Sequence, residues 1–105
     1  MEHIVVLVTA STDNEAETIA RALLEKRLVA CCNIVGGVRS LYRWQGSVAD
    51  DKEVLLVIKS RADMFDKIKE TVSALHSYTV PEIIALPVTA GSAAYLAWID
   101  QNLTS

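Results

Sequence analysis

Residues 30–59, ACCNIVGGVRSLYRWQGSVADDKEVLLVIK, predict one long β-hairpin around which the rest of the chain is organised. From residue 38 to 45 the first arm carries apolar and polar side chains on both faces. The doublet at 36–37 fits a bulge, since glycine lets a strand bend without steric cost. We expect the turn over 46–52, which holds glycine, serine and aspartate. The second arm, 53–59, has an unbroken apolar centre, as is typical of a strand covered on both faces.

Strand and helix patterns alternate on either side of this hairpin. Residues 3–9 are an apolar run that predicts a second buried strand. Thr12 and Glu15 form a capping box, which predicts a helix whose apolar stripe runs as far as Leu28. The elements expected after the hairpin are an amphipathic helix over 60–75, a loop over 76–82, a strand over 83–88 and a short helix that opens at 91–92.

This order of elements, β-α-β-β-α-β with an extra C-terminal helix, is that of a ferredoxin-like α+β sandwich with an antiparallel sheet. The first and third strands of that fold are central, in agreement with their apolar sequences. Pro87 inside the last strand favours an edge position, where a missing N–H donor costs least. If both helices cover one face of the sheet, the other face is too apolar to lie in water. We therefore expect self-association, with part of the first hairpin arm packed against another chain.

Composition restricts the function further. The 105 residues suffice for one domain, which we expect to span 1–105. A net charge of -3 disfavours binding to nucleic acid or to an anionic membrane, because both attract basic surfaces. The sequence has no leader-peptide pattern and no apolar run of membrane-spanning length, so we expect a cytoplasmic protein with Cys31 and Cys32 reduced. Since the phosphate-binding and nucleophile motifs of enzymes are absent from the sequence, we expect no enzymatic activity.

Six collinear segments carry a resemblance to a known family. They are E-x4-A-R at 15–21, L-x-A-C-x-N at 28–33, S-L-Y-x-W-x-G at 40–46, E-V-x-L-x-x-K at 53–59, H-x-Y-x-x-P-E-I at 76–83 and Y-L-x-W-I at 95–99. Together they closely resemble the CutA family, the divalent-cation-tolerance proteins. The resemblance implies a compact homotrimer in which the second and third strands join sheets across subunits. It also implies a likeness to the PII signalling proteins, which bind small effectors between subunits, and a link to copper and other divalent metals.

The chain departs from this family at a proposed copper site. Some members use a cysteine near the end of the first strand and two adjacent histidines after the second helix. Val8, Leu75 and His76 stand at those positions here, so the chain lacks two of the three ligands. We therefore do not expect a copper site of that design.

The candidate ligands for copper or another divalent metal ion are His76, the one ligand of that site that is present, and Cys31. Thiolates and imidazoles bind such ions well, but no spacing typical of a metal site supplies them with partners. The alternatives are a thiol that packs as a small hydrophobe and a histidine with a structural role. The sequence thus predicts weak metal binding by a homotrimer, without a definite cofactor.

A second candidate site is a ligand cleft between subunits. Lys59 and Glu53 flank an apolar strand, where a charge needs a partner or water. Together with Tyr78, Glu82 and Trp44 they are candidate lining residues of a cleft for a small anionic metabolite. The alternatives are exposed strand ends joined by an ion pair and aromatic side chains that pack in an interface. A trimeric scaffold without any small ligand is the third interpretation.

Overall fold

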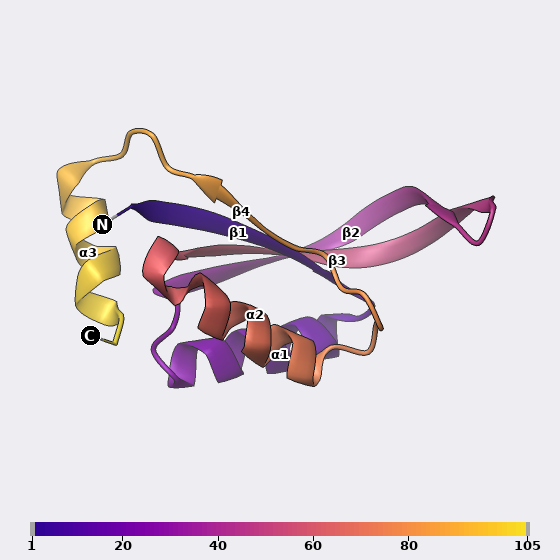
Figure 1. Ribbon diagram of the computed structural model, residues 1–105, viewed down its shortest axis with the longest axis horizontal. Coiled ribbons are helices and arrows are strands. Elements are labelled where there is room, and N and C mark those ends of the chain that lie inside the picture. The colour runs from indigo at the N-terminus through magenta and orange to yellow at the C-terminus, as the bar shows by residue number, and fades with distance from the viewer. Residues whose placement is uncertain (1, 105) are drawn as a thin grey trace.

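The computed structural model describes residues 2–104 and has the element order β-α-β-β-α-β-α (Figure 1). Its elements are β1 (His3–Ala10), α1 (Asp13–Glu25), β2 (Cys31–Trp44), β3 (Ser47–Arg61), the 3-10 helix η1 (Ala62–Met64), α2 (Phe65–Leu75), β4 (Ile83–Pro87) and α3 (Ala93–Asn102). The predicted α+β class with an extra C-terminal helix is confirmed. No helix of the described part is long and apolar enough to cross a membrane.

The four strands form one antiparallel sheet in the order β2-β3-β1-β4. The two strands with apolar sequences, β1 and β3, are therefore central, as predicted. Pro87 pairs with Ile4 on the edge strand β4, so the predicted edge position is also confirmed.

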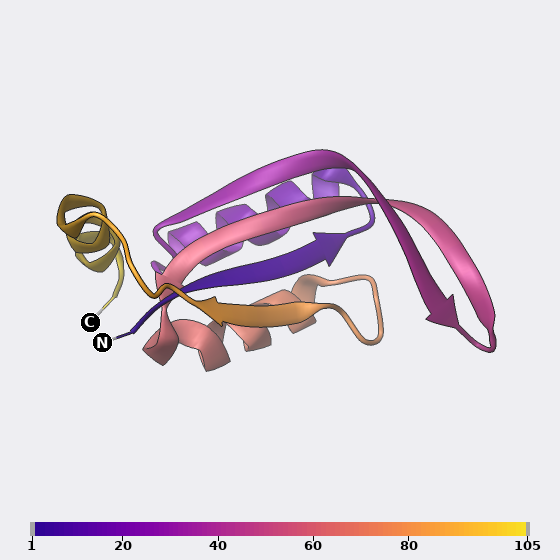
Figure 2. The same cartoon turned by 90° about the horizontal axis from the view of Figure 1, so that it is seen from above.

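Both α1 and α2 cover the same face of this sheet, while α3 packs at one end (Figures 1 and 2). Alternate residues of β1 face the helices and are almost fully buried, namely Ile4, Val6, Val8 and Ala10. The apolar stripe of α1 packs against them with Ala16, Ile19, Ala20 and Leu23. The helix begins as predicted, because the Thr12 hydroxyl oxygen accepts a hydrogen bond from the Glu15 backbone N–H at 3.1 Å.

Three predicted boundaries are wrong. The turn of the hairpin does not span 46–52, because Trp44 pairs with Ser47 and only Gln45 and Gly46 remain between the strands. Both have positive φ, 50° and 81°, as a tight type I′ turn requires. The aspartates that indicated a longer turn lie in the ladder instead, where Asp50 pairs with Leu41 and its carboxylate accepts a hydrogen bond from the side chain of Arg39.

The other two corrections concern helix boundaries. β3 continues to Arg61, so α2 begins at Phe65 rather than at residue 60. The first helix ends at Glu25 rather than near Leu28, because Arg27 adopts a left-handed conformation with φ of 57°. Leu28 is nonetheless buried, and the segment that follows it is tied to β3, where the Ala30 N–H donates to the backbone oxygen of Lys59 at 2.9 Å.

The β2–β3 hairpin extends well beyond the helices (Figure 2). The register shifts between Val35 and Val38, where Gly37 has φ of 73°, so the predicted bulge is confirmed. β1 pairs only with residues 54–61 of β3, so residues 47–53 pair with β2 alone. The outer part of the hairpin is consequently a two-stranded ribbon, which rarely persists in water unless something packs on it.

The face of the sheet opposite α1 and α2 is apolar and largely open. Residues paired across strands share a face, which places Leu86 beside Val5 and Ile84 beside Leu7 on this side. Ile84 is 50% exposed and Leu86 is 45% exposed. We call the surface formed by Val5, Leu7, Ile84 and Leu86 the open sheet face. It is the apolar surface that the sequence predicted for contact with another chain.

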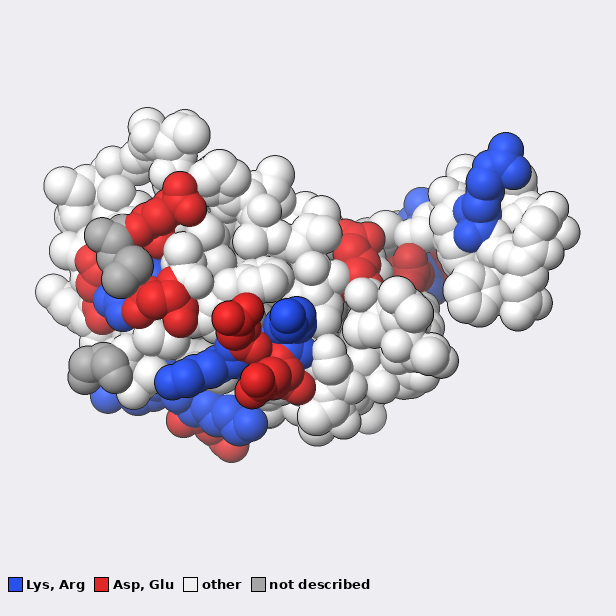
Figure 3. Space-filling model, in the orientation of Figure 1, with Lys and Arg blue, Asp and Glu red and all other residues white. Residues whose placement is uncertain are grey.

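Charged side chains do not form a large patch of one sign on the face drawn in Figure 3, where basic and acidic groups alternate over the body of the molecule. Several are joined in pairs, such as Arg61 with Asp63 at 3.0 Å and Arg21 with Glu17 at 2.7 Å. This distribution agrees with the net charge of -3 and offers no basic field for a polyanion.

Candidate functional site

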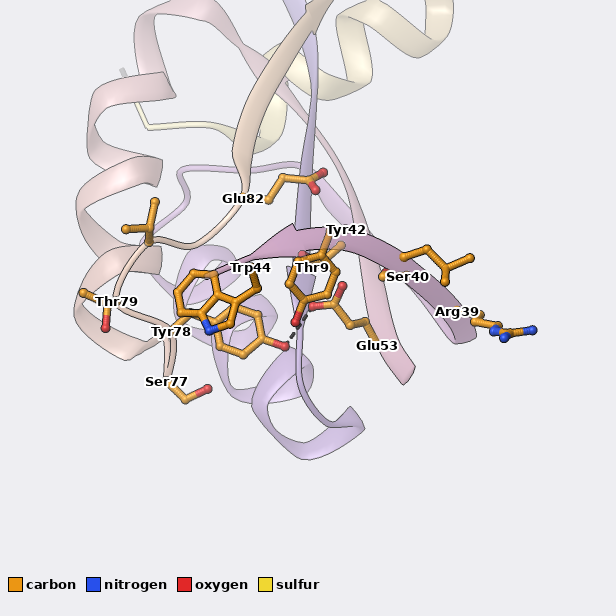
Figure 4. A pocket seen from close by; sticks show the side chains of 12 residues that line it. Thr9, Arg39, Ser40, Tyr42, Trp44, Glu53, Ser77, Tyr78, Thr79 and Glu82 are labelled. Carbon is orange, nitrogen blue, oxygen red and sulfur yellow. Dashed lines mark hydrogen bonds between the residues drawn. The ribbon is translucent and has the colours of Figure 1, made fainter. Parts of the chain in front are cut away.

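A cavity of about 790 Å³ lies where the outer part of β2 passes over the end of β1 and the loop that follows α2 (Figure 4). β2 contributes aromatic and polar side chains, β3 contributes one carboxylate, and the loop between α2 and β4 closes the other side. The lining residues are Thr9, Arg39, Ser40, Leu41, Tyr42, Trp44, Glu53, Ser77, Tyr78, Thr79, Val80 and Glu82.

The floor of this pocket is a contact between Glu53 and Tyr78. Glu53 is only 9% exposed, and its Oε2 accepts a hydrogen bond of 2.8 Å from the Tyr78 hydroxyl. Burial, together with this hydrogen bond to a carboxylate, raises the pKa of Tyr78 well above its usual value. Tyr78 is thus a neutral donor at physiological pH, and it holds the buried carboxylate in place.

Polar pairs on the hairpin form the rim of the pocket. Tyr42 donates a hydrogen bond to Asp51 on the neighbouring strand, and this bond raises the pKa of the Tyr42 phenol. Arg39 donates two hydrogen bonds, of 2.9 Å and 2.7 Å, to the carboxylate of Asp50. The guanidinium also lowers the pKa of that carboxyl group. The charge of Arg39 is therefore matched locally.

His76 anchors the loop that carries Tyr78. Its side chain is 0% exposed, and Nε2 donates to the backbone oxygen of Thr9 at 2.6 Å. Nδ1 accepts from the Tyr78 N–H at 3.0 Å, so both nitrogens of a neutral imidazole are engaged. Glu15 Oε2 accepts a further bond of 3.0 Å from the N–H of Ser77. These contacts tie the loop to β1 and α1, and they give His76 a structural role in this conformation.

The structure brings together four of the five predicted cleft residues. Trp44, Glu53, Tyr78 and Glu82 all line the pocket, whereas Lys59 does not. Lys59 lies six residues from Glu53 along an extended strand, a span of roughly 20 Å. Its ammonium donates to the side chain of Asn33 instead.

Sequence reasoning named Tyr42 only as one of several aromatic residues that could line a cleft or pack in an interface, and it did not name Arg39 as a lining residue. The signal for Tyr42 was present, since it alternates in phase with Ser40 and Trp44 and therefore shares their side of the strand. No sequence signal was available for Arg39, because its place on the rim depends on the register that sets it close to Asp50.

The two predicted metal ligands lie far apart in one chain, Cys31 at the start of β2 and His76 after α2. Cys31 is near α3, where its sulfur lies 3.5 Å from the Tyr95 hydroxyl. Cys31 pairs with Lys59 on β3, which in turn pairs with Val5, so Cys31 is level with Val5 of β1. His76 contacts Thr9, four residues further along β1. That offset corresponds to roughly 13 Å.

A single chain does not fit a metal centre. Among residues 2–104, no group of three or more His, Cys, Asp and Glu side chains is placed to hold a metal ion. The thiol of Cys32 is also a poor ligand. Its burial, and to a smaller extent the neighbouring Cys31, raise its pKa to about 11. Both cysteines are free, as the sequence predicted.

Comparison with known proteins identifies close relatives over nearly the whole chain. The family described as "CutA1 divalent ion tolerance protein" matches residues 4–102. The divalent-cation tolerance protein CutA of Thermus thermophilus is 54% identical over 98 residues, which are 93% of this chain and 95% of that protein. The chloroplastic protein CutA of Arabidopsis thaliana is 45% identical over 99 residues. This chain spans only about half of that longer relative, 54% of its length.

Solved structures agree with these sequence matches. The Thermus thermophilus divalent cation tolerance protein superposes with a TM-score of 0.95 at 52% identity, covering 97% of this chain and 99% of that one. CutA1 from Oryza sativa gives 0.96 at 40% identity, with coverages of 99% and 95%. A protein from Archaeoglobus fulgidus described as periplasmic gives 0.93 at 39% identity, with coverages of 95% and 97%.

The names of these relatives include chloroplastic and periplasmic proteins, so the cytoplasmic location of this chain stays a prediction. The matches nevertheless agree in family, in fold and over almost the full length of the chain. The chain therefore belongs to the CutA1 family of divalent ion tolerance proteins, which are not enzymes.

Proposed function

We propose that this chain works as a homotrimer in the tolerance of divalent metal ions such as copper, and that it binds these ions weakly. Membership of the CutA1 family supports the role in tolerance. The proposal of a homotrimer is supported by the exposed apolar side chains of the open sheet face. We also propose that residues 1–105 form one CutA-like domain, since the described elements share one hydrophobic core.

Two features of the monomer favour assembly. The open sheet face leaves the large side chains of Ile84 and Leu86 about half exposed, and burying such groups against another subunit gains roughly 1 kcal/mol each. The outer hairpin is a two-stranded ribbon with Leu41 and Val48 64% and 68% exposed. A neighbouring subunit that packs on both features would remove most of this apolar surface from water.

Weak rather than tight metal binding follows from the state of the two candidate ligands. His76 must exchange a hydrogen bond with Thr9 or Tyr78 before it can bind a metal ion. Cys31 must leave the hydroxyl of Tyr95 and lose its proton. Because the two residues are far apart in one chain, each ion needs ligands from more than one subunit, and each lost contact lowers the affinity.

Equilibrium dialysis against Cu(I), Cu(II) and Zn(II) tests this proposal. We expect dissociation constants between about 1 µM and 1 mM for the wild type, and weaker binding for Cys31→Ala combined with His76→Ala. Cys32→Ala is the matched control, since its thiol stays protonated at neutral pH and should not contribute. Binding weaker than millimolar, or binding that the double variant does not change, would remove metal binding from the proposal.

A PII-like role with a small anionic metabolite held at Lys59 is a second candidate, but the position of Lys59 outside the pocket does not favour it. A thermal-shift screen of anionic metabolites, run on the wild type and on Lys59→Ala, is its test. The third interpretation, a trimeric scaffold without a ligand, is not specifically favoured by any feature of residues 2–104.

A further inference from the structure

We propose that the pocket beneath the hairpin binds a small organic ammonium cation, whose charge lies against Glu53 and whose methylene groups lie against the rings of Tyr42, Trp44 and Tyr78. This site is separate from the candidate metal ligand Cys31, and the inference goes beyond the role in metal tolerance. It reverses the sign of the ligand expected from sequence, since Lys59 is not part of the pocket.

The charge of the pocket favours a cation. Glu53 and Glu82 both line it, and Asp51 lies at its rim through the hydrogen bond with Tyr42. Arg39 is the one basic side chain among the described residues of the lining, and its guanidinium is committed to Asp50. A ligand inside the pocket therefore meets two carboxylates without a free cation to balance them.

Glu53 is the group most suited to recognise the ligand. The residue is 9% exposed, and its Oε2 accepts the hydrogen bond from the Tyr78 hydroxyl. Every side-chain nitrogen or oxygen of residues 2–104 that is fully buried has a hydrogen-bond partner. Oε1 accepts no hydrogen bond from any residue of that range, so it is not fully buried. Because Glu53 lines the pocket, Oε1 faces it. A buried carboxylate without a counter-charge is costly, and an ammonium group bound to Oε1 would offset that cost.

The aromatic residues supply the second half of the recognition. Figure 4 shows the ring of Tyr42 next to Glu53, with the indole of Trp44 and the ring of Tyr78 beside it. The face of an aromatic ring attracts a cation through its quadrupole and also accepts alkyl groups. Because Tyr78 keeps its proton, its ring adds no second negative charge to the floor of the pocket. A carboxylate surrounded by aromatic rings suits an alkylammonium ion.

The same residues are unsuited to a metal ion or an anion. A metal ion requires several oxygen, nitrogen or sulfur ligands at once, and the described residues place no group of three such acidic, histidine or cysteine side chains together. An anion would lie next to Glu53 with no free basic group to compensate. The organic cation is therefore the class of ligand that the lining favours.

Intrinsic tryptophan fluorescence provides the assay. The chain has two tryptophans, and Trp98→Phe leaves Trp44 in the pocket as the single tryptophan. Putrescine, 1,4-butanediol and succinate have similar lengths but carry positive, zero and negative charge. We expect putrescine alone to give a saturable change, with a dissociation constant below about 1 mM at constant ionic strength. The protein is used in its native assembly, so a pocket that a neighbouring subunit fills would give no signal.

Substitutions connect the signal to the pocket. Glu53→Gln keeps the shape of the side chain and should weaken putrescine binding about tenfold or more, as expected when a charged hydrogen-bond partner is lost. Glu82→Gln, at an exposed position that packing does not require, should weaken it about threefold. Glu70→Gln on the exposed side of α2 is the matched control and should leave the dissociation constant unchanged. If Glu53→Gln does not fold, Glu82→Gln still tests the role of charge.

Four results would overturn the inference. The first three are succinate binding as tightly as putrescine, no saturable change with putrescine up to about 10 mM, and unchanged affinity in the glutamine variants. Displacement of putrescine by equimolar Zn(II) would assign the pocket to a metal and would also count against an organic cation. Because the assay reports only on Trp44, its failure is distinguishable from a failure of metal binding at Cys31.

Discussion

The open sheet face leads to a quantitative prediction about assembly. Leu86→Lys places an ammonium group on this face, next to Val5 on the neighbouring strand. Leu86 is 45% exposed in the isolated chain, so about half of its side chain remains to be buried by another subunit. The substitution should therefore act on assembly far more than on the fold of one chain.

The size of the effect follows from this exposure. Complete burial of a leucine side chain is worth about 1.5–3 kcal/mol, so the exposed half contributes roughly 1 kcal/mol per subunit. Three subunits lose about 3 kcal/mol, which lowers the assembly constant by about a hundredfold. Three ammonium groups forced into an apolar contact each cost several kcal/mol more. We expect Leu86→Lys to be mainly monomeric at micromolar concentration.

Sedimentation equilibrium of the wild type and the variant measures this directly. Leu24→Lys is the matched control, because Leu24 is 41% exposed but lies on α1, in the layer opposite the open sheet face. It should assemble like the wild type, and a lysine in the last turn of a helix is also compatible with the helix dipole. A wild type that is monomeric and stable, or a Leu86→Lys variant that still forms trimers, would refute the reasoning.

Three further predictions concern single side chains. His76→Ala should lower the free energy of unfolding by about 3 kcal/mol, because two hydrogen bonds and the packing of a buried ring are lost, and a cost below about 1 kcal/mol in urea unfolding would contradict the structural role. A Cys31→Ser variant, which retains only the Cys32 thiol, should react slowly with a disulfide reagent at pH 8, because burial is the main cause of the raised pKa of Cys32 and is unchanged in this variant; fast labelling would argue against its burial. Asp63 has a pKa lowered mainly by its hydrogen bond with an arginine, so its stabilisation is present above the pKa of the unfolded chain and is lost as the pH falls through the lowered value. Unfolding measured from pH 7 to pH 3 should therefore show a weaker acid dependence for Asp63→Asn than for the wild type.

Local sequence determined the elements and their order. The apolar runs marked β1 and β3 as central strands, Pro87 marked the edge strand, and the glycine doublet marked the bulge. These features depend on alternation, on a missing donor and on backbone freedom, which each act within a few residues. Four of the five predicted cleft residues line one pocket for a related reason, since they lie at strand ends or in a loop whose residue types already suggested a site.

Tertiary pairing decided what local patterns leave open. The hairpin turn is two residues long because the ladder continues to Trp44 and Ser47, although the aspartates nearby are residues that turns favour. Lys59 and Glu53 have opposite charges, which suggested a shared site. Lys59 nevertheless lies outside the pocket, because it is six residues from Glu53 along an extended strand. Register and strand direction are set by contacts between segments far apart in the sequence, so the set of side chains that lines the pocket becomes visible only in the folded chain.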